Sequence, residues 1–142
     1  MSLIGVNPDL DCVRTLLAAA QLPVEDLTAA HCRDFFFMGP PGAPTGLIGL
    51  ELFGDVALLR SLVVAPSGRN SGAGTALVRH AEDHARRHGV HSLYLLTTTA
   101  ETFFAKRGYN HAPRETAPPA IEATKEFSGI CPASAAFMAK LL

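Results

Sequence analysis

The sequence predicts a single mixed α/β domain built around one central β-sheet. Residues 56–65 form a near-continuous run of apolar residues rich in Val and Leu, which is typical of a strand buried on both faces. A glycine-rich stretch follows at 69–74. A helical pattern then runs to Gly89, with apolar residues at every fourth position and acid–base pairs four residues apart. A buried strand, a tight turn and an amphipathic helix in this order indicate a sheet covered by helices.

The composition limits the class of protein. With 142 residues, 48% of them hydrophobic, the chain is long enough for one domain with an ordinary core. The net charge of −1 and the lack of a basic stripe argue against a nucleic-acid partner. The sequence has no basic leader and no apolar run of membrane-spanning length, so we expect a cytoplasmic protein without a membrane partner.

No residue pattern in the sequence is typical of a metal site. Three cysteines occur at wide spacings, without a CxxC pair: Cys12, Cys32 and Cys131. His80, His84 and His88 recur every fourth residue beside arginines on the charged side of a helix, where a solvated face is a simpler interpretation than a metal site. We therefore expect no metal ion.

The first half of the chain is predicted to contain short strands and two helices. Residues 3–6 are a strand candidate, and Asp9 can cap a helix that extends to Ala20. Pro23, with acidic residues close behind it, suggests a second short helix over 23–30. Further strands, separated by loops rich in Gly and Pro, are expected at 35–38, 47–53 and 56–65.

The second half is predicted to add strands and short helices behind the central helix. Gly108 is expected to end one of these helices, and prolines mark a loop before another. The expected elements are a strand at 92–97, a helix at 100–107, a strand beginning at Tyr109, a helix at 120–127 and a final strand at 134–142.

The turn between the central strand and its helix is a candidate ligand site. Arg69-Asn70-Ser71-Gly72-Ala73-Gly74 combines a positive charge with glycines that let the backbone approach a ligand closely. The start of the following helix presents unpaired N–H groups. These features favour an anion such as a phosphate or pyrophosphate. A tight turn without a ligand is the alternative.

Three kinds of nucleotide-binding turn compare differently with this stretch. A P-loop requires Lys followed by Ser or Thr after its last glycine, whereas Thr75-Ala76 follow here. A Rossmann turn requires a third small residue and an acidic residue at the end of the next strand, whereas Leu77 and Thr97-Thr98-Thr99 occupy these places. The pattern Arg-x-x-Gly-x-Gly after a buried strand is matched at every position.

This pattern resembles the acetyl-coenzyme A signature of the GCN5-related N-acetyltransferase (GNAT) superfamily. A second stretch, Phe103-Phe104 to Gly108-Tyr109, is similar to the superfamily's helix and Gly-aromatic segment behind the fifth strand. The resemblance covers the whole chain. It implies the GNAT fold, with the element order β-α-α-β-β-β-α-β-α-β-β and a mixed sheet whose fourth and fifth strands splay apart.

The resemblance also implies a cosubstrate and partners. The cosubstrate is acetyl-CoA, and the implied cofactor-binding residues are Leu62, Val63, Val64, Arg69, Asn70, Ser71, Gly72, Ala73, Gly74, Thr75, Phe103 and Phe104. The other partner is a small-molecule amine acceptor. Pairing of two copies through the outer strands is common in this fold, so a homodimer is compatible with the resemblance although no sequence feature shows it.

A narrower resemblance concerns the C-terminal half. The stretches Leu95 to Ala100, Glu126-Phe127 and Cys131-Pro132 are similar to those of the arsenic-resistance N-acetyltransferase subfamily. This resemblance implies an amino-acid-like acceptor, with glutamate analogues that contain arsenic or phosphorus among the candidates.

The usual acid–base pair of the superfamily is absent. Phe104 aligns with the common tyrosine acid, and Leu58 or Leu59 with the common glutamate base. Two alternatives follow: an enzyme that works by proximity and relays, or a catalytically silent coenzyme A-binding module. Relay candidates are Ser61, Glu51, Tyr109, His111 and Glu126.

Arginines are the strongest candidates for acceptor recognition. Arg60 lies in an apolar run, where its charge requires compensation. It either points into the acceptor groove or forms a structural ion pair with an acidic residue on a neighbouring strand. Arg114 follows the sixth strand, near the wall that the resemblance implies for the acceptor site, or is an ordinary surface residue. Ser61, Thr97 and Cys131 complete the expected acceptor set, with a buried structural role as the alternative for Cys131.

Overall fold

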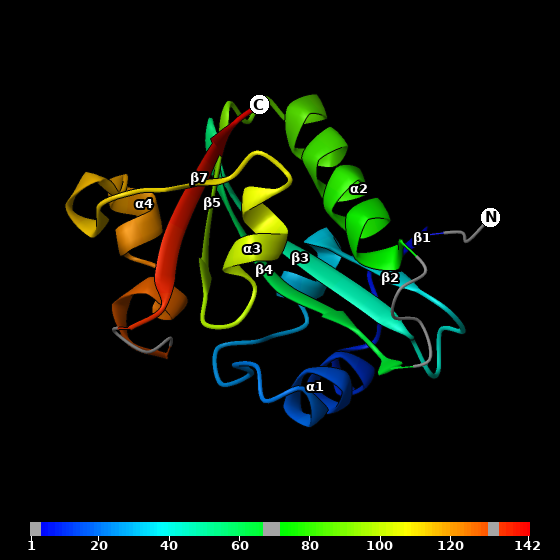
Figure 1. The fold of residues 1–142 in the computed structure, drawn as a ribbon. Coiled ribbons are helices and arrows are strands. Elements are labelled where there is room, and N and C mark those ends of the chain that lie inside the picture. The colour runs from blue at the N-terminus through cyan, green and yellow to red at the C-terminus, as the bar shows by residue number, and fades with distance from the viewer. Residues whose placement is uncertain (1–3, 67–71, 131–133) are drawn as a thin grey trace.

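A seven-stranded mixed sheet organises the protein (Figure 1). The computed structural model describes residues 4–66, 72–130 and 134–142. The strand order is β1-β2-β3-β4-β5-β7-β6, and all neighbours are antiparallel except β4 and β5, which are parallel. The strands are β1 (Ile4–Val6), β2 (Phe35–Met38), β3 (Gly46–Phe53), β4 (Val56–Val64), β5 (Ser92–Thr97), β6 (Asn110–His111) and β7 (Ala136–Leu141).

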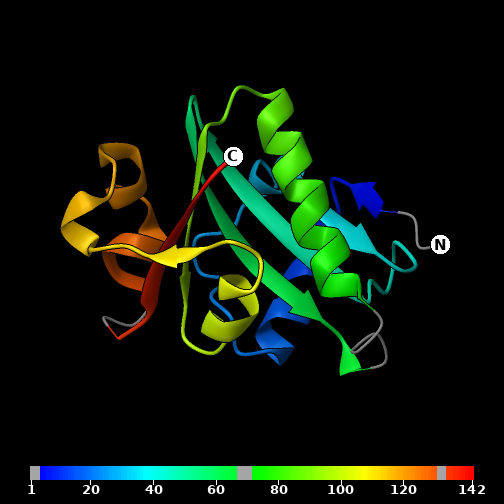
Figure 2. The same ribbon diagram turned by 45° about the horizontal axis from the view of Figure 1, so that its top comes forward.

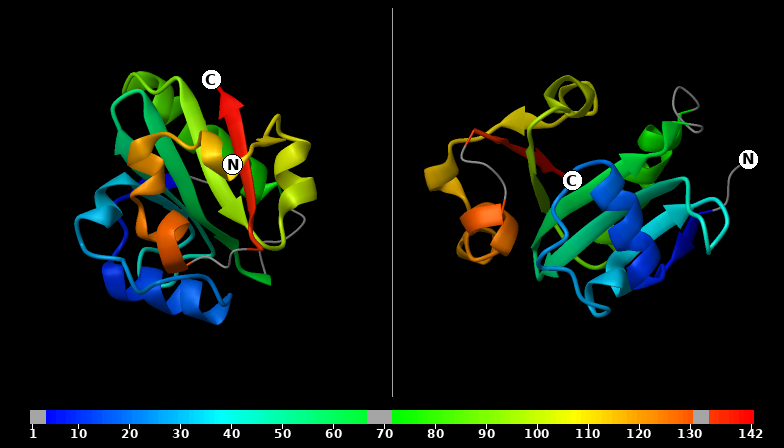
Figure 3. Two further views of the ribbon diagram at one scale, coloured as in Figure 1. Left: turned by 90° about the vertical axis from the view of Figure 1, so that its left-hand side faces the viewer. Right: turned by 90° about the horizontal axis from the view of Figure 1, so that it is seen from below.

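Helices cover both faces of the sheet (Figures 1 and 3). α2 (Ala73–Arg87) and α3 (Glu101–Ala105) pack on one face, over a core that contains Leu77 and Phe104. α1 (Leu10–Ala19) lies on the opposite face with a core around Leu17. The remaining helical elements are η1 (His31–Asp34), η3 (Arg114–Thr116), α4 (Pro119–Glu122) and the π-helix η4 (Glu126–Ile130). Within the described residues, no helix combines the length and apolar character that membrane crossing requires.

The central strand behaves as its composition predicts. Ala57 and Leu59 are buried in the α2 core, while Leu58 is fully buried on the opposite face against Ile121. In a regular strand, Val63 would lie on the same face as Ala57 and Leu59. Instead it packs on the α1 face, so the alternation of side chains between the two faces changes near the end of the strand. The change coincides with a register shift between β3 and β4, where two β4 residues lie opposite Ile48 alone. β4 therefore contains a bulge at Ser61-Leu62.

The expected separation of the fourth and fifth strands is confirmed. β4 and β5 pair over only three residue pairs, the last of which is Leu58 with Tyr94. Beyond that point the strands diverge, as Figures 1 and 2 show. The remaining edges of β4 and β5 thus face a gap in the sheet rather than each other.

Two predicted helices are corrected by the structure. Residues 23–30 form turns instead of a helix, and the helical turn η1 begins only at His31. Asp26 and Leu27 are both directed into the protein, whereas successive helical residues point about 100° apart. The expected helix at 120–127 ends as α4 at Glu122, because Thr124 Oγ1 donates to the Ile121 carbonyl and accepts from Phe127 N.

The first testable prediction concerns the close packing opposite the bulge. Gly49 pairs with Arg60 across the β3–β4 ladder, and a Cβ atom there would lie 2.3 Å from the ring of Phe35, which is fully buried. Gly49→Ala should therefore lower the free energy of unfolding by about 1–3 kcal/mol in chemical denaturation. Gly42→Ala is the matched control, with nothing within 4 Å of the added atom, and should change it by less than about 0.5 kcal/mol. Equal stabilities of the two variants would contradict this account.

A second prediction concerns the histidines that pack on β2. The ring of His84 meets Phe36 at 4.9 Å and His88 at 4.2 Å, and its Nε2 lies 3.5 Å from Asp34 Oδ1. Burial, followed by the neighbouring His88, lowers the pKa of His84. The unfolded chain therefore binds a proton at a higher pH than the folded chain does. Stability should fall as the pH decreases from about 6.5, the unfolded pKa, through the lower folded value.

The measurement is chemical denaturation at pH 7.5 and at pH 5 for the wild type and His84→Gln. Between pH 7.5 and pH 5, the free energy of unfolding should decrease less in His84→Gln than in the wild type. His91→Gln, at an exposed loop position, should show the full wild-type decrease. A wild-type protein that is more stable at pH 5 would overturn this assignment.

Candidate active site

A cleft opens where β4 and β5 separate. Its volume is about 350 Å³, and it lies between the two strands, the loop after α1, the turn after β5 and the start of β7. The lining residues are Gln21, Leu22, Pro23, Glu25, Leu59, Arg60, Ser61, Leu62, Leu95, Leu96, Thr97, Thr98, Thr99, Ala100, Phe104, Glu126 and Ala135. The sequence predicted six of these as site residues: Arg60, Ser61, Leu62, Thr97, Phe104 and Glu126.

Arg60 is the charged centre of this region. Its guanidinium is fully buried and contacts three carboxylates: Asp26 at 2.5 and 3.0 Å, Glu51 at 2.9 Å and Glu126 at 3.1 Å. Glu51 lies on the neighbouring strand β3, so of the two alternatives the sequence left open, the structure shows the ion pair. The protein itself thus compensates the charge of Arg60.

The electrostatics of Arg60 and Asp26 agree with this geometry. Burial opposes the charged form of Arg60, but the hydrogen bonds that it donates to Asp26 and the charge of Glu126 outweigh burial and raise the pKa of Arg60 above its ordinary value. Burial likewise opposes the charged form of Asp26, whereas the hydrogen bonds and charge of Arg60 lower its pKa overall. Both groups are therefore held in their charged forms at neutral pH.

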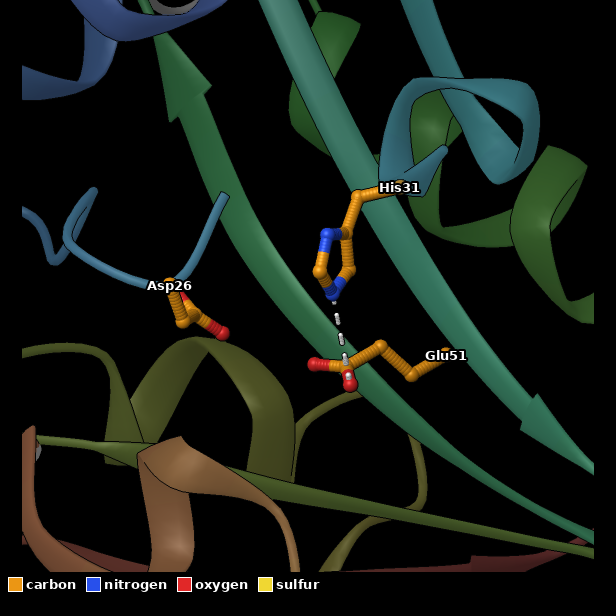
Figure 4. A group of neighbouring side chains, drawn as sticks. All are labelled: Asp26, His31 and Glu51. Carbon is orange, nitrogen blue, oxygen red and sulfur yellow. Dashed lines mark ion pairs between the residues drawn. The ribbon is translucent and has the colours of Figure 1, made fainter. Parts of the chain in front are cut away.

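One group of side chains among the described residues has the spacing of metal ligands. Asp26, His31 and Glu51 come from three different segments and place one ligand atom each within 4.8 Å of the others (Figure 4). His31 Nε2 lies 3.8 Å from Glu51 Oε1. However, Arg60 Nη1 lies 2.5 Å from Asp26 Oδ2 and 2.9 Å from Glu51 Oε2. The guanidinium thus bridges the two carboxylates in the way a cation would, so we do not assign a metal to this group.

Ser61 occupies the bulge itself. Its φ angle of 61° lies in the left-handed region, which is uncommon for a residue other than glycine. Arg60 Nε donates a hydrogen bond to Ser61 Oγ at 3.0 Å. The arginine that the carboxylates fix therefore also fixes the serine hydroxyl at the edge of the cleft.

The start of α2 provides the part of the predicted anion site that the structure describes. Gly72 caps the helix with φ 81°, and Ala73 is the first helical residue. A Cβ atom on Gly74 would lie 3.2 Å from the Phe103 ring, so the backbone approaches α3 closely there. Arg69, Asn70 and Ser71, which the sequence predicts for the same site, lie outside the described residues.

A contact that the sequence did not predict joins α2 to the segment behind α3. Arg107 donates to Thr75 Oγ1 at 2.5 and 3.1 Å, and its guanidinium lies 3.6 Å from the centre of the Phe103 ring. Arg107 is thirty-two positions from Thr75, so spacing along the chain gave no signal of this contact. Arg107 thereby contacts both Thr75 in the first turn of α2 and Phe103 in α3.

Tyr109 and His111, two of the relay candidates, do not line the cleft. Tyr109 is 1% exposed and donates its hydroxyl to Glu82 Oε2 at 2.9 Å, away from the gap between β4 and β5. Burial and the charge of Glu82 raise its pKa well above the ordinary range for tyrosine. His111 is exposed and pairs with Glu101 at 2.9 Å. The candidate Glu126, by contrast, lines the cleft and is buried.

The remaining predicted residues lie close to the cleft or outside the described residues. Arg114 Nη2 donates a hydrogen bond of 2.7 Å to the carbonyl oxygen of Ala135. Ala135 lines the cleft. Val63 and Val64 follow the bulge and pack on opposite faces of the sheet. Thr97 Oγ1 accepts a hydrogen bond from Ala100 N at 3.0 Å. Cys131 lies outside the described residues.

This arrangement of elements identifies the family. Residues 13–109 match the acetyltransferase (GNAT) family, and this range contains the splayed strands, the bulge and the start of α2. The chain belongs to the acetyltransferase (GNAT) family. The residues that follow the matched range contribute β6 and β7 to the same sheet, and Glu126 of η4 and Ala135 to the cleft.

Individual relatives agree with this assignment. The chain is 42% identical over 57 residues to an amino-acid acetyltransferase of Ralstonia nicotianae, covering 40% of this chain and 13% of the relative. It is 34% identical to an uncharacterised N-acetyltransferase of Chlorobaculum tepidum, covering 64% of this chain and 59% of that protein. The chain thus spans less than two thirds of either curated relative.

The fold is also that of a solved structure. N-acetylglutamate synthase from Neisseria gonorrhoeae, in complex with coenzyme A and N-acetyl-glutamate, has a TM-score of 0.86 at 20% identity. The similar region covers 100% of this chain and 35% of that one. At this level of identity the likeness shows that the two share a fold.

The ion-pair cluster yields a third prediction. Arg60→Met should leave three carboxylates without their cation, so the free energy of unfolding should fall by about 3–5 kcal/mol. Thermal and chemical denaturation would measure this loss of stability. Arg86→Met is the matched control, because the 2.9 Å pair between Arg86 and Asp83 is largely exposed, and it should cost less than about 1 kcal/mol. An Arg60→Met protein as stable as the wild type would rule out the structural role of the cluster.

Proposed function

We propose that this protein is an acetyl-CoA-dependent N-acetyltransferase that acts on the amine of a small-molecule acceptor. The observation that supports it most is the cleft between β4 and β5 in a member of the acetyltransferase (GNAT) family. The cleft offers unpaired strand edges and a fixed hydroxyl, and α2 begins at a glycine turn after β4. The family and the geometry together support transfer of an acetyl group from a thioester.

The proposed cosubstrate site follows β4 toward α2. The pantetheine arm would run along the edge of β4 that faces β5, at Leu62 to Val64, as an added strand does. A backbone N–H of this segment would polarise the thioester carbonyl. The pyrophosphate would lie against the helix start at Gly72 to Thr75, where the helix dipole favours an anion, and Arg69 would add its charge. Phe103 and Phe104 of α3 would form the wall of the cosubstrate site on that side.

The acceptor is proposed to be amino-acid-like, because two kinds of comparison favour it. Curated relatives are named amino-acid acetyltransferases, and the solved neighbour was crystallised with N-acetyl-glutamate. Glutamate analogues that contain arsenic or phosphorus, which the resemblance to the arsenic-resistance subfamily suggests as candidates, belong to the same chemical class. Arg60, however, is already bound by three carboxylates. An acceptor carboxylate would therefore meet Thr97, Thr98 and Thr99 in the turn after β5.

A second candidate function is a silent coenzyme A-binding module. Leu58 and Leu59 are buried and apolar where a base is common, and Phe104 lines the cleft where a tyrosine is common. The enzyme remains our proposal, because positioning alone contributes up to about 7–11 kcal/mol to such reactions. A cytoplasmic location, where acetyl-CoA is available, is part of the proposal.

The cosubstrate site provides the fourth prediction. Gly74→Ala should weaken acetyl-CoA binding at least about tenfold in calorimetry, because the new methyl group lies between Phe103 and the ligand's path to the helix start. Alanine favours helix more than glycine does, so this variant should retain the wild-type melting temperature. Gly42→Ala, in a loop far from α2 in the sequence, should bind acetyl-CoA as the wild type does. Unchanged affinity in Gly74→Ala would contradict the proposed site.

Turnover distinguishes the two candidate functions. Release of free thiol from acetyl-CoA would be followed with a panel of amines weighted toward glutamate, other amino acids and phosphorus- and arsenic-containing glutamate analogues. We expect turnover with at least one amino-acid-like acceptor. Tight binding of acetyl-CoA without turnover on any amine would favour the silent module instead.

A further inference from the structure

We infer that Ser61 is the catalytic residue that passes a proton from the acceptor amine to the departing coenzyme A thiolate, and that Arg60 is its positioning residue. This inference rests on the proposed function. It goes further by assigning the proton transfer, for which the usual tyrosine and glutamate are missing, to a hydroxyl that the fold fixes in place.

The hydrogen bond between Arg60 and Ser61 determines the direction of the hydroxyl proton. Ser61 Oγ accepts from Arg60 Nε at 3.0 Å, and a guanidinium is only a donor. The proton of Ser61 must therefore be donated elsewhere, and no described residue takes it. Because Ser61 lines the cleft, a ligand between β4 and β5 is the available acceptor.

The backbone of Ser61 indicates that its position is built rather than incidental. Its φ of 61° is unfavourable for a residue with a side chain, and it lies at the bulge that shifts the β3–β4 register. This strain persists only where the surroundings fix the conformation. Here the surroundings are Arg60 and its three carboxylates, which hold the Nε donor against the serine.

Three other side chains of the cleft, those of Thr97, Glu126 and Phe104, are less suited to the transfer. Thr97 Oγ1 accepts from Ala100 N in the turn after β5, at the opposite wall. Glu126 is bound to Arg60 at 3.1 Å, and its carboxylate is an acceptor only. Phe104 has no donor. Ser61 combines an oxygen that accepts from a fixed cation with a proton that it can donate.

The proposed transfer joins the acceptor nitrogen to the acetyl group and returns the serine to its starting state. The lone pair of the neutral amine forms a C–N bond with the thioester carbonyl carbon, and the carbonyl π electrons move to oxygen. Those electrons then re-form the C=O bond while the C–S bond breaks, and sulfur leaves with the bonding pair. A proton moves from the former amine nitrogen to Ser61 Oγ as the Oγ proton moves to sulfur. The products are an amide, free coenzyme A thiol and an unchanged serine.

Arg60 supports this transfer electrostatically. While the two protons move, Oγ carries partial negative charge, and the Nε–H of Arg60 already points at it. A donor held in place before the reaction needs no reorganisation during it. The carboxylates contribute indirectly, because they prevent the guanidinium from turning away.

The test compares variants that separate the hydroxyl from the backbone conformation. Ser61→Ala and Ser61→Gly both lose the hydroxyl, but glycine adopts a positive φ without strain. Both should lower kcat by about 10²–10⁴-fold, while acetyl-CoA affinity by calorimetry stays near the wild-type value. Ser61→Thr, which keeps a hydroxyl, should restore part of kcat. Ser92→Ala, at the paired end of β4 and β5, serves as the control with normal turnover.

The positioning role of Arg60 has its own measurement. Arg60→Lys keeps a charge but lacks the forked donors, so kcat should fall at an acetyl-CoA KM close to the wild-type value. Combining it with Ser61→Gly should lower kcat no further than Ser61→Gly alone, because both act through the same hydroxyl. A purely structural role of Arg60 predicts additive losses, which would remove it from the mechanism.

The possible failures are distinguishable. Wild-type kcat in Ser61→Gly would overturn the relay while leaving the N-acetyltransferase intact. Loss of acetyl-CoA affinity in Ser61→Gly, in proportion to the loss of kcat, would also overturn it, because the residue would then act in binding. A wild-type chain that binds acetyl-CoA but acetylates no amine would overturn the proposed function, and the relay with it.

Discussion

A buried guanidinium surrounded by three carboxylates is the interaction on which the cleft depends. Arg60 joins β4 to Glu51 on β3, to Asp26 in the loop after α1 and to Glu126 in η4. Of these segments β4, the loop and η4 line the cleft, and neither the loop nor η4 is a strand of the sheet. Buried charges stabilise a fold only when all of them are paired. The ion pairs therefore form only when these segments are packed against one another.

In the proposed mechanism, the bulge links this structural cluster to the reaction. An extra residue in β4 reverses the side-chain alternation, so that residues on both sides of Ser61 can pack while the serine turns toward the gap. The divergence of β4 from β5 then leaves strand edges free for a ligand. The divergence from β5, the bulge and the start of α2 follow one another along the chain, so the proposed binding and chemistry both involve one short stretch.

The sequence predicts most strands and the main helices well, but it does not predict the side-chain contacts between distant segments. The apolar run of β4, the α2 pattern and the positions of most strands followed from periodicity, and the family resemblance supplied the separation of β4 and β5. The helix expected at 23–30 was wrong because its propensity is overridden by the contact of Asp26 with Arg60, thirty-four positions away. The burial of Tyr109 against Glu82 likewise depends on packing between α2 and the segment that joins α3 to β6. For Arg60, the sequence showed that compensation was needed but not which partner supplied it.

The most direct test of the account is a crystal structure of the wild-type protein with coenzyme A. We predict that the pantetheine arm lies between β4 and β5, with its sulfur within hydrogen-bonding reach of Ser61 Oγ and its pyrophosphate at the start of α2. Arg60 should remain bound to Asp26, Glu51 and Glu126 in that complex. Coenzyme A bound with its sulfur away from the bulge, or an Arg60 released from its carboxylates to contact the ligand, would contradict the account.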